Sequence, residues 1–319
     1  MVGFGGDGPD RAASGAAWRP GVILRCGEEV AIVLPAAQLP DAEAGLLDEA
    51  ARVLESWGLR VRMPIERSHH FYLAGSDRAR AAHLDAVLRD PKVRAVFAAR
   101  GGYGSMRLFP HLDPAGARAR KILVGFSDVT ALQLAGRTLW PRVQSVHGPN
   151  IASRHFLGAT PEAQQNREAL HGALFDAAYA VEAPVEFLRQ GKAAGPLLGG
   201  CLSLVAAMLG SGFVPPTAGA ILFLEDVREA PYRIDRMLVQ LCNAGLFSEV
   251  AGVVFGEMHE CTDGINDLRE VIGDVLAEGS FPIAFGLPAG HGETNIALPL
   301  GARAVLESAR GRFVLRRRG

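Results

Sequence analysis

Ser127 stands where an apolar segment passes directly into a helical pattern. Residues 121–126 form a continuous apolar run apart from Lys121, and residues 129–135 have the spacing of a helix. A serine at such a turn exposes its hydroxyl at the carboxyl edge of a parallel sheet, where free N–H groups of the helix can stabilise an oxyanion. The turn lacks the second glycine of a G-x-S-x-G nucleophile elbow. Taken alone, the pattern favours a helix cap by Ser127 or Asp128 over a catalytic serine.

Two other segments could supply the acid and the base that a serine nucleophile needs. Glu225 and Asp226 end an apolar run, and His291 lies in a glycine-flanked loop after another apolar run. A serine hydroxyl is a weak nucleophile until a base takes its proton, and the base needs a third group that fixes its tautomer. Caps or ion pairs would explain the two carboxylates better when they are considered alone. Spacing does not show that Ser127, Glu225 and His291 meet.

A glycine-rich segment, Arg100 to Gly104, follows a third apolar run. Because glycine permits close approach and positive φ, N–H groups of Gly101 or Gly102 could complete an oxyanion pocket or hold a phosphate. A plain turn explains the segment equally well. The glycines match neither a P-loop nor G-x-G-x-x-G, which disfavours a nucleotide site. No metal is expected, because the sequence around His259 offers no convincing set of ligands.

Composition narrows the classes of protein that remain. A chain of 319 residues with 49% hydrophobic and 21% charged residues is typical of a soluble globular protein with two domains. Its 33 basic and 34 acidic residues create no strong field, so neither nucleic acid nor a membrane is an expected partner. The four cysteines form no C-x-x-C pair, and no secretory signal is recognisable, which together indicate the cytoplasm.

The elements that must position these residues follow from the alternation of apolar runs and helical patterns. Strands are predicted at 30–34, 59–63, 93–99 and 121–126, with helices between them, which indicates a mostly parallel sheet covered on both faces. We predict a flexible leader at 1–20, an N-terminal domain at 21–156, a linker at 157–192 and a smaller β-rich α/β domain at 193–319. Strands in this second domain are predicted at 220–224, 250–255 and 282–285.

Taken together, these segments resemble the LD-carboxypeptidase family of serine peptidases, over about Val30 to Leu306. The matching motifs are Ala74-Gly-Ser-Asp77, Arg100-Gly-Gly-Tyr-Gly104, Gly125-Phe-Ser-Asp128, His147-Gly-Pro149, Leu198-Gly-Gly-Cys-Leu-Ser203, Leu224-Glu-Asp226, Tyr232-Arg-Ile-Asp-Arg-Met237, Gly290-His291 and Leu298-Pro-Leu-Gly301. Cys201 stands where the family often carries asparagine.

The resemblance implies a role for each candidate residue. Ser127 corresponds to the nucleophile, Glu225 to the acid and His291 to the general base, with an oxyanion hole from the N–H groups of Gly102 and Asp128. The N-terminal domain would be Rossmann-like, and the acid and base would reach Ser127 across the domain interface. The family uses no cofactor and commonly forms homodimers.

The implied substrate is a cytoplasmic murein tetrapeptide, cut between meso-diaminopimelate and the terminal D-alanine during peptidoglycan recycling. Arg233 and Arg236 are candidates to bind the substrate carboxylates, although ordinary ion pairing explains them more simply. The family also includes self-immunity peptidases that hydrolyse antibiotic peptide-nucleotide conjugates, but the segment 258–267 has no Phe, Tyr or Trp to stack on a base. A non-catalytic module that binds an anion or a peptide at the glycine-rich turn is the alternative from another class.

Overall fold

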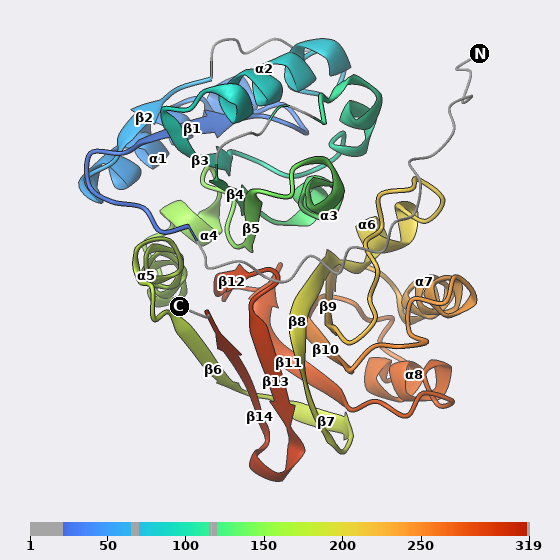
Figure 1. The fold of residues 1–319 in the computed structure, drawn as a ribbon. Helices are drawn as coiled ribbons and strands as arrows, with labels where there is room; N and C mark the ends of the chain where they lie inside the picture. Colours follow the sequence, from blue (N-terminus) through green and yellow to red (C-terminus); the bar gives the residue numbers. More distant parts are fainter. Residues whose placement is uncertain (1–21, 65–69, 115, 117–119, 318–319) are drawn as a thin grey trace, which may run out of the picture.

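The apolar runs of the N-terminal half form the buried strands of a six-stranded sheet (Figure 1). The computed structural model describes residues 22–64, 70–114, 116 and 120–317, so the leader predicted at 1–20 lies outside the described residues. In sheet order, the strands are β12 (Leu298–Pro299), β5 (Val143–His147), β4 (Lys121–Gly125), β3 (Val93–Ala98), β1 (Glu29–Val33) and β2 (Arg60–Arg62). Among the pairings of this sheet, that of β12 with β5 is antiparallel and the others are parallel. The order β2-β1-β3-β4-β5 is that of a doubly wound domain, which confirms the predicted fold class.

Helices cover both faces of this sheet because side chains alternate along each strand. On β1, Val30 and Ile32 pack in the same cluster as Leu54 of α1 (Gly45–Ser56). Ala31 and Val33 belong instead to the cluster of α2 (Asp77–Arg89) and α3 (Thr130–Leu139). A continuous apolar run is therefore required in each central strand, which is why these strands were recognisable in the sequence.

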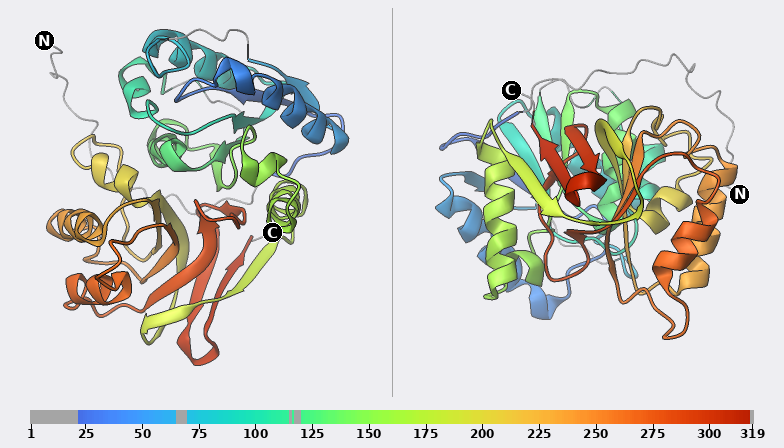
Figure 2. Two further views of the ribbon diagram at one scale, coloured as in Figure 1. Left: turned by 180° about the vertical axis from the view of Figure 1, so that it is seen from behind. Right: turned by 90° about the horizontal axis from the view of Figure 1, so that it is seen from below.

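The second sheet has eight strands and carries its helices on one side (Figure 2). Its order is β6 (Ala180–Pro184), β14 (Arg312–Arg316), β13 (Arg303–Glu307), β8 (Lys192–Cys201), β9 (Ile221–Val227), β10 (Gly252–His259), β11 (Ile283–Gly290) and β7 (Glu186–Arg189). The four strands β8 to β11 are parallel to one another, and the outer pairings are antiparallel. The helices α6 (Leu202–Ala207), α7 (Pro231–Asn243) and α8 (Leu268–Val275) pack on it through Val205, Ile234 and Ile272.

The segment predicted as a linker, 157–192, contains regular structure. It follows α4 (Arg154–Leu157) and holds α5 (Pro161–Phe175), which the Thr160 hydroxyl caps by accepting from Ala163 N–H at 3.2 Å. It also contains β6 and β7, which pair with β14 and β11 in the second sheet. The helical period is weak because α5 buries polar Asn166 within its inner stripe. The domain limits given above stay a prediction.

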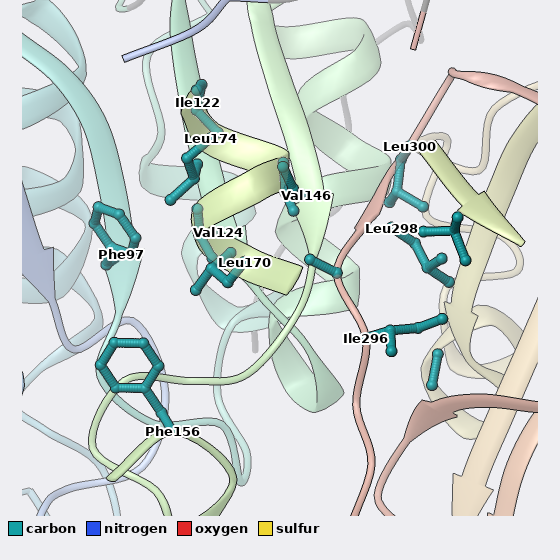
Figure 3. Close-up of a cluster of buried hydrophobic side chains, with 14 of the residues drawn as sticks. Phe97, Ile122, Val124, Val146, Phe156, Leu170, Leu174, Ile296, Leu298 and Leu300 are labelled. Atoms are coloured by element: carbon teal, nitrogen blue, oxygen red, sulfur yellow. The ribbon is translucent and has the colours of Figure 1, made fainter. Parts of the chain in front are cut away.

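The N-terminal and C-terminal halves of the chain share a continuous apolar contact. Figure 3 shows Phe97, Ile122, Val124 and Val146 of the first sheet with Leu170 and Leu174 of α5 and Ile296, Leu298 and Leu300 of the C-terminal half. Backbone pairing of β12 with β5 and a hydrogen bond from Cys201 N–H to the Thr130 hydroxyl, 3.1 Å long, also join the halves. This contact fixes how the carboxyl edges of the two sheets meet. Among the helices of the described ranges, none has the length and apolarity of a membrane span.

Candidate active site

Ser127 occupies a sharp turn between β4 and α3, at the start of a single 3-10 turn, Ser127–Val129. Its φ of 63° lies in the left-handed region, which costs a residue with a side chain about 1–3 kcal/mol and is found preferentially at functional sites. Within the described ranges, the Ser127 hydroxyl bonds to His291 and the Asp128 carboxylate accepts from Ser105 N–H, and neither caps the helix that follows. The turn therefore does not form the helix cap that the sequence pattern favoured. Its strained geometry resembles a nucleophile elbow.

Glu225 and His291 lie beside this turn, although both are far from Ser127 in the sequence, His291 by 164 residues. Glu225 is fully buried on β9, and His291 directly follows β11. His291 Nε2 is 3.0 Å from Ser127 Oγ, and His291 Nδ1 is 2.6 Å from Glu225 Oε2. In the tautomer protonated at Nδ1, His291 donates to the carboxylate and accepts from the serine hydroxyl.

The charges around His291 favour its protonated form. Burial opposes protonation, but the charge and hydrogen bond of Glu225, together with the charge of Asp226, outweigh burial and raise the pKa of His291 above its usual value. Burial also raises the pKa of Asp226 to about 6, an effect to which the Glu225 charge adds. A proton taken from Ser127 would thus be held on an imidazolium that the adjacent carboxylate stabilises.

The glycine-rich turn lies directly against Ser127. A Cβ added at Gly101 would be 3.0 Å from Ser127 Cβ and 3.2 Å from Ser127 Oγ. The N–H groups of Gly102 and Asp128 make no hydrogen bond to another residue in the described part of the chain. These two groups are therefore available to a ligand, as an oxyanion hole would require.

Gly101→Ala is expected to lower kcat/KM by about 10²-fold, since displacement of a reacting group by a few tenths of an ångström to 1 Å carries costs of this order. The added methyl group would press on both Ser127 and the side-chain amide of Asn150, whose Nδ2 would be 3.2 Å from the new carbon. Steady-state kinetics with a peptide substrate measures the effect. Gly45→Ala, where no atom lies within 4 Å of the added methyl, is the matched control. Equal rates for the two variants would contradict the tight fit at Gly101.

Three polar side chains that hold these turns were missed by the sequence analysis. Arg80, buried on α2, donates to Pro35 O, to Gly75 O at 3.2 Å and to Gly104 O at 3.0 Å. Asn150 accepts from Phe126 N–H at 3.3 Å, and Gln133 donates to Gly125 O at 2.8 Å. Their signal is weak because single buried polar residues follow no period. Arg80 and Asn150 each lie just beyond the end of a family motif, which was the one hint that the sequence offered.

The predicted carboxylate contacts are not part of this hydrogen-bonded group. Arg233 is exposed on α7, where it pairs with Glu229 at 3.4 Å and lies over the Tyr232 ring, and Arg236 lies over the same ring at 5.5 Å. No hydrogen bond or ion pair joins either arginine to Ser127, Glu225 or His291 within the described ranges, so their role stays a prediction. In the same ranges, no three His, Cys, Asp or Glu side chains are grouped as a metal ion would require.

Both halves of the chain match models of one protein family. A family model described as the LD-carboxypeptidase N-terminal domain matches residues 30–148, and one described as the LD-carboxypeptidase C-terminal domain matches residues 194–306. The chain is 31% identical to the murein tetrapeptide carboxypeptidase of Pseudomonas aeruginosa, over 95% of this chain and 99% of that protein.

Solved structures with the same fold include two that differ in name. The muramoyltetrapeptide carboxypeptidase from Oxalobacter formigenes superposes with a TM-score of 0.79 at 31% identity, covering 90% of this chain and 98% of that one. An MccF-like protein from Bacillus anthracis superposes with a TM-score of 0.85 at 23% identity, covering 94% of this chain and all (100%) of that one. At that identity, the second likeness shows the fold alone.

Proposed function

The chain belongs to the LD-carboxypeptidase family of serine peptidases, and on this premise we propose that it removes the terminal D-alanine from murein tetrapeptide. The bond cut is the amide between the L-centre of meso-diaminopimelate and D-alanine. The observation that carries the proposal is the hydrogen-bonded chain from Ser127 through His291 to Glu225, with distances of 3.0 and 2.6 Å.

In the proposed first half-reaction, Ser127 Oγ attacks the carbonyl carbon of the scissile amide. His291 Nε2 takes the hydroxyl proton as the new C–O bond forms, and Glu225 stabilises the imidazolium through Nδ1–H. The N–H groups of Gly102 and Asp128 bind the oxyanion of the tetrahedral intermediate. When the C–N bond breaks, His291 gives its proton to the amine, and D-alanine leaves with the serine acylated.

The second half-reaction uses the same groups. His291 takes a proton from a water molecule that attacks the acyl carbon, and the ester C–O bond then breaks with return of that proton to Ser127 Oγ. The products are the shortened peptide with a free carboxylate and the regenerated serine. We place this reaction in the cytoplasm, where recycled wall peptides are processed, and propose a homodimer as the assembled form.

Two measurements on the purified protein test the proposal. The first is release of D-alanine from murein tetrapeptide, and the second is labelling of Ser127 by a serine-reactive phosphonate, read by peptide mass spectrometry. Release together with labelling supports the peptidase. Labelling with cleavage of peptide-nucleotide conjugates alone would replace murein peptide by that substrate class. Neither release nor labelling would leave an anion- or peptide-binding module.

We expect kcat/KM to rise with pH through a midpoint above 6.5. The general base must be neutral, and the pKa of His291 is raised because the Glu225 charge outweighs burial. Below this pKa the protonated imidazole cannot accept the Ser127 proton, so the rate falls as the pH falls. Initial rates between pH 5 and 9 at low substrate concentration give the profile. A rate that is constant between pH 5 and 8 would contradict the assignment of His291 as base.

A further inference from the structure

Four polar atoms of Glu225, His147 and Asn295 are buried and have no hydrogen-bond partner within the described ranges. They are Oε1 of Glu225, both ring nitrogens of His147, and Nδ2 of Asn295. All three side chains are fully buried. Buried polar atoms are nearly always paired in native proteins, with protein groups or with enclosed water, because an unpaired one keeps its full desolvation cost. A group of four therefore indicates a shared partner.

The ring of His147 lies on the same side of β9 as the Glu225 carboxylate. It is 4.9 Å from the Phe223 ring, and Phe223 is two residues before Glu225, so both side chains point to one face of the strand. The ring is also 5.8 Å from that of Phe126, which in turn lies 4.8 Å from His291. His147 thus lies near the acid and the base, but within the described ranges it makes no direct hydrogen bond to either.

Backbone pairing fixes where His147 can lie. It is the last residue of β5, opposite Gly125 of β4 and opposite Leu298 of β12. Gly125 leads into the turn of Ser127, whereas β12 belongs to the C-terminal half. His147 therefore stands between the strand that carries the nucleophile and the half that carries the acid and base.

Asn295 is the third member of this buried group. Its side-chain Oδ1 accepts from Gly290 N–H at 3.1 Å, and its backbone N–H donates to Asn166 Oδ1 at 2.7 Å. With Oδ1 held in this way, the amide can offer only its Nδ2 hydrogens to the buried group. Asn295 lies close to His147, although within the described ranges no hydrogen bond between them meets ordinary geometry.

His147 is neutral at physiological pH. Burial lowers its pKa to about 4, despite the opposing effect of the nearby Glu225 carboxylate. A neutral imidazole has one N–H donor and one acceptor nitrogen. It can therefore hydrogen-bond to a water molecule without placing a second charge beside the acid.

We propose that His147 is a positioning residue for Glu225, and that with Asn295 it encloses one water molecule that donates a hydrogen bond to Glu225 Oε1. The water accepts from Asn295 Nδ2 and bonds to one ring nitrogen of His147, which gives it the three partners usual for a buried water. Glu225 is then held at both oxygens, Oε1 by the water and Oε2 by His291. The proposal rests on the proposed function, because it assigns Glu225 the task of orienting His291.

The test compares His147→Leu with His147→Gln. Leucine fills the space but cannot bond to the water, and we expect kcat to fall about 10- to 100-fold with KM nearly unchanged, as for other residues that orient a ligand through a second group. Glutamine keeps a donor and an acceptor and should recover kcat to about 3-fold below the wild type. Equal kcat for wild type and His147→Leu would overturn the proposal, as would equal loss in both variants.

His83→Leu is the matched control. His83 lies half-buried on α2, and its buried Nε2 also lacks a partner within the described ranges, so it reports what removal of an unpaired imidazole does to stability alone. We expect this variant to keep wild-type kcat.

A high-resolution crystal structure of the wild type tests the proposal independently, including the case in which the His147 variants do not fold. Ordered water within hydrogen-bond distance of Glu225 Oε1 supports it, and continuous density without such a water overturns it. If the wild type released no D-alanine, the proposed function would be contradicted. The enclosed water would then be tested by the crystal structure alone.

Discussion

Ser127→Ala is expected to lower kcat for D-alanine release by about 10⁶-fold, as removal of the nucleophile does in other serine peptidases. Alanine has no oxygen to form the acyl bond, so only the oxyanion N–H groups and the bound geometry would still accelerate hydrolysis. Folding should change little, because the Ser127 hydroxyl has a single hydrogen bond within the described ranges, the one to His291 Nε2 at 3.0 Å. Stopped assays over hours, with D-alanine determined enzymatically, cover the required range.

Binding and labelling distinguish loss of chemistry from loss of the site. The alanine variant should bind tetrapeptide with a Kd close to the wild-type KM where chemistry is slow, and it should take up no phosphonate. Ser56→Ala is the control, since that hydroxyl bonds to Val53 O at 2.7 Å on the exposed side of α1. Retention of more than a tenth of wild-type kcat by Ser127→Ala would exclude Ser127 as the nucleophile.

The position of Ser127 could be predicted because its neighbours form a long local signal. A continuous apolar strand followed at once by a helical pattern leaves room only for a sharp turn, and the structure has β4, the turn and α3 in that order. The same holds for β1, β3 and β9, whose central residues are buried. The local pattern did not indicate the backbone conformation of Ser127. It favoured a helix cap, whereas the structure has a strained turn in which the φ of Ser127 is 63°.

The meeting of Glu225 and His291 could not be derived from spacing. They lie at the ends of β9 and β11, which are separated by β10, and they meet because parallel strands present their carboxyl ends at one edge. Which edge faces Ser127 depends on how the two halves pack, and in particular on β12, a two-residue strand too short to leave a pattern. Only the family resemblance supplied that pairing.

The buried polar residues of the site also could not be predicted from the sequence. Arg80, Asn150 and Asn295 each hold backbone groups of the site, but a single polar residue inside an apolar segment or a loop follows no period. The helix α5 within the segment 157–192 left only a weak helical pattern for a related reason, because it places Asn166 on its buried face, where Asn166 donates to His155 O and Glu293 O. Hydrogen bonding between halves thus replaces the apolar stripe by which a helix is normally found.

Glu225→Gln should lower kcat by about 10⁴-fold, the cost of presenting the base in the wrong tautomer. The carboxylate accepts the Nδ1 proton of His291 at 2.6 Å, whereas a glutamine amide can donate to Nδ1 and so place the proton on Nε2, where it blocks transfer from Ser127. Loss of the Glu225 charge also removes the main influence that opposes burial, so the pKa of His291 should fall. The acid limb of the remaining kcat/KM profile should accordingly move to lower pH.

Asp226→Asn provides the matched control for Glu225→Gln, because it neutralises the next residue in an equally buried position. The Asp226 carboxylate accepts from Ser203 N–H at 2.8 Å and from Val227 N–H at 2.9 Å, but within the described ranges it makes no hydrogen bond to His291. We expect it to reduce kcat less than about 10-fold, because its effect on His291 acts only through charge, and to lower the melting temperature through the weakened backbone bonds. If the two variants lost activity equally, the acid would act through the local field alone, and the hydrogen bond at His291 Nδ1 would have no special part in catalysis. A much larger loss of kcat in Glu225→Gln than in Asp226→Asn, with a lower pKa of His291 only in Glu225→Gln, would show that the Glu225 carboxylate sets both the tautomer and the charge of His291.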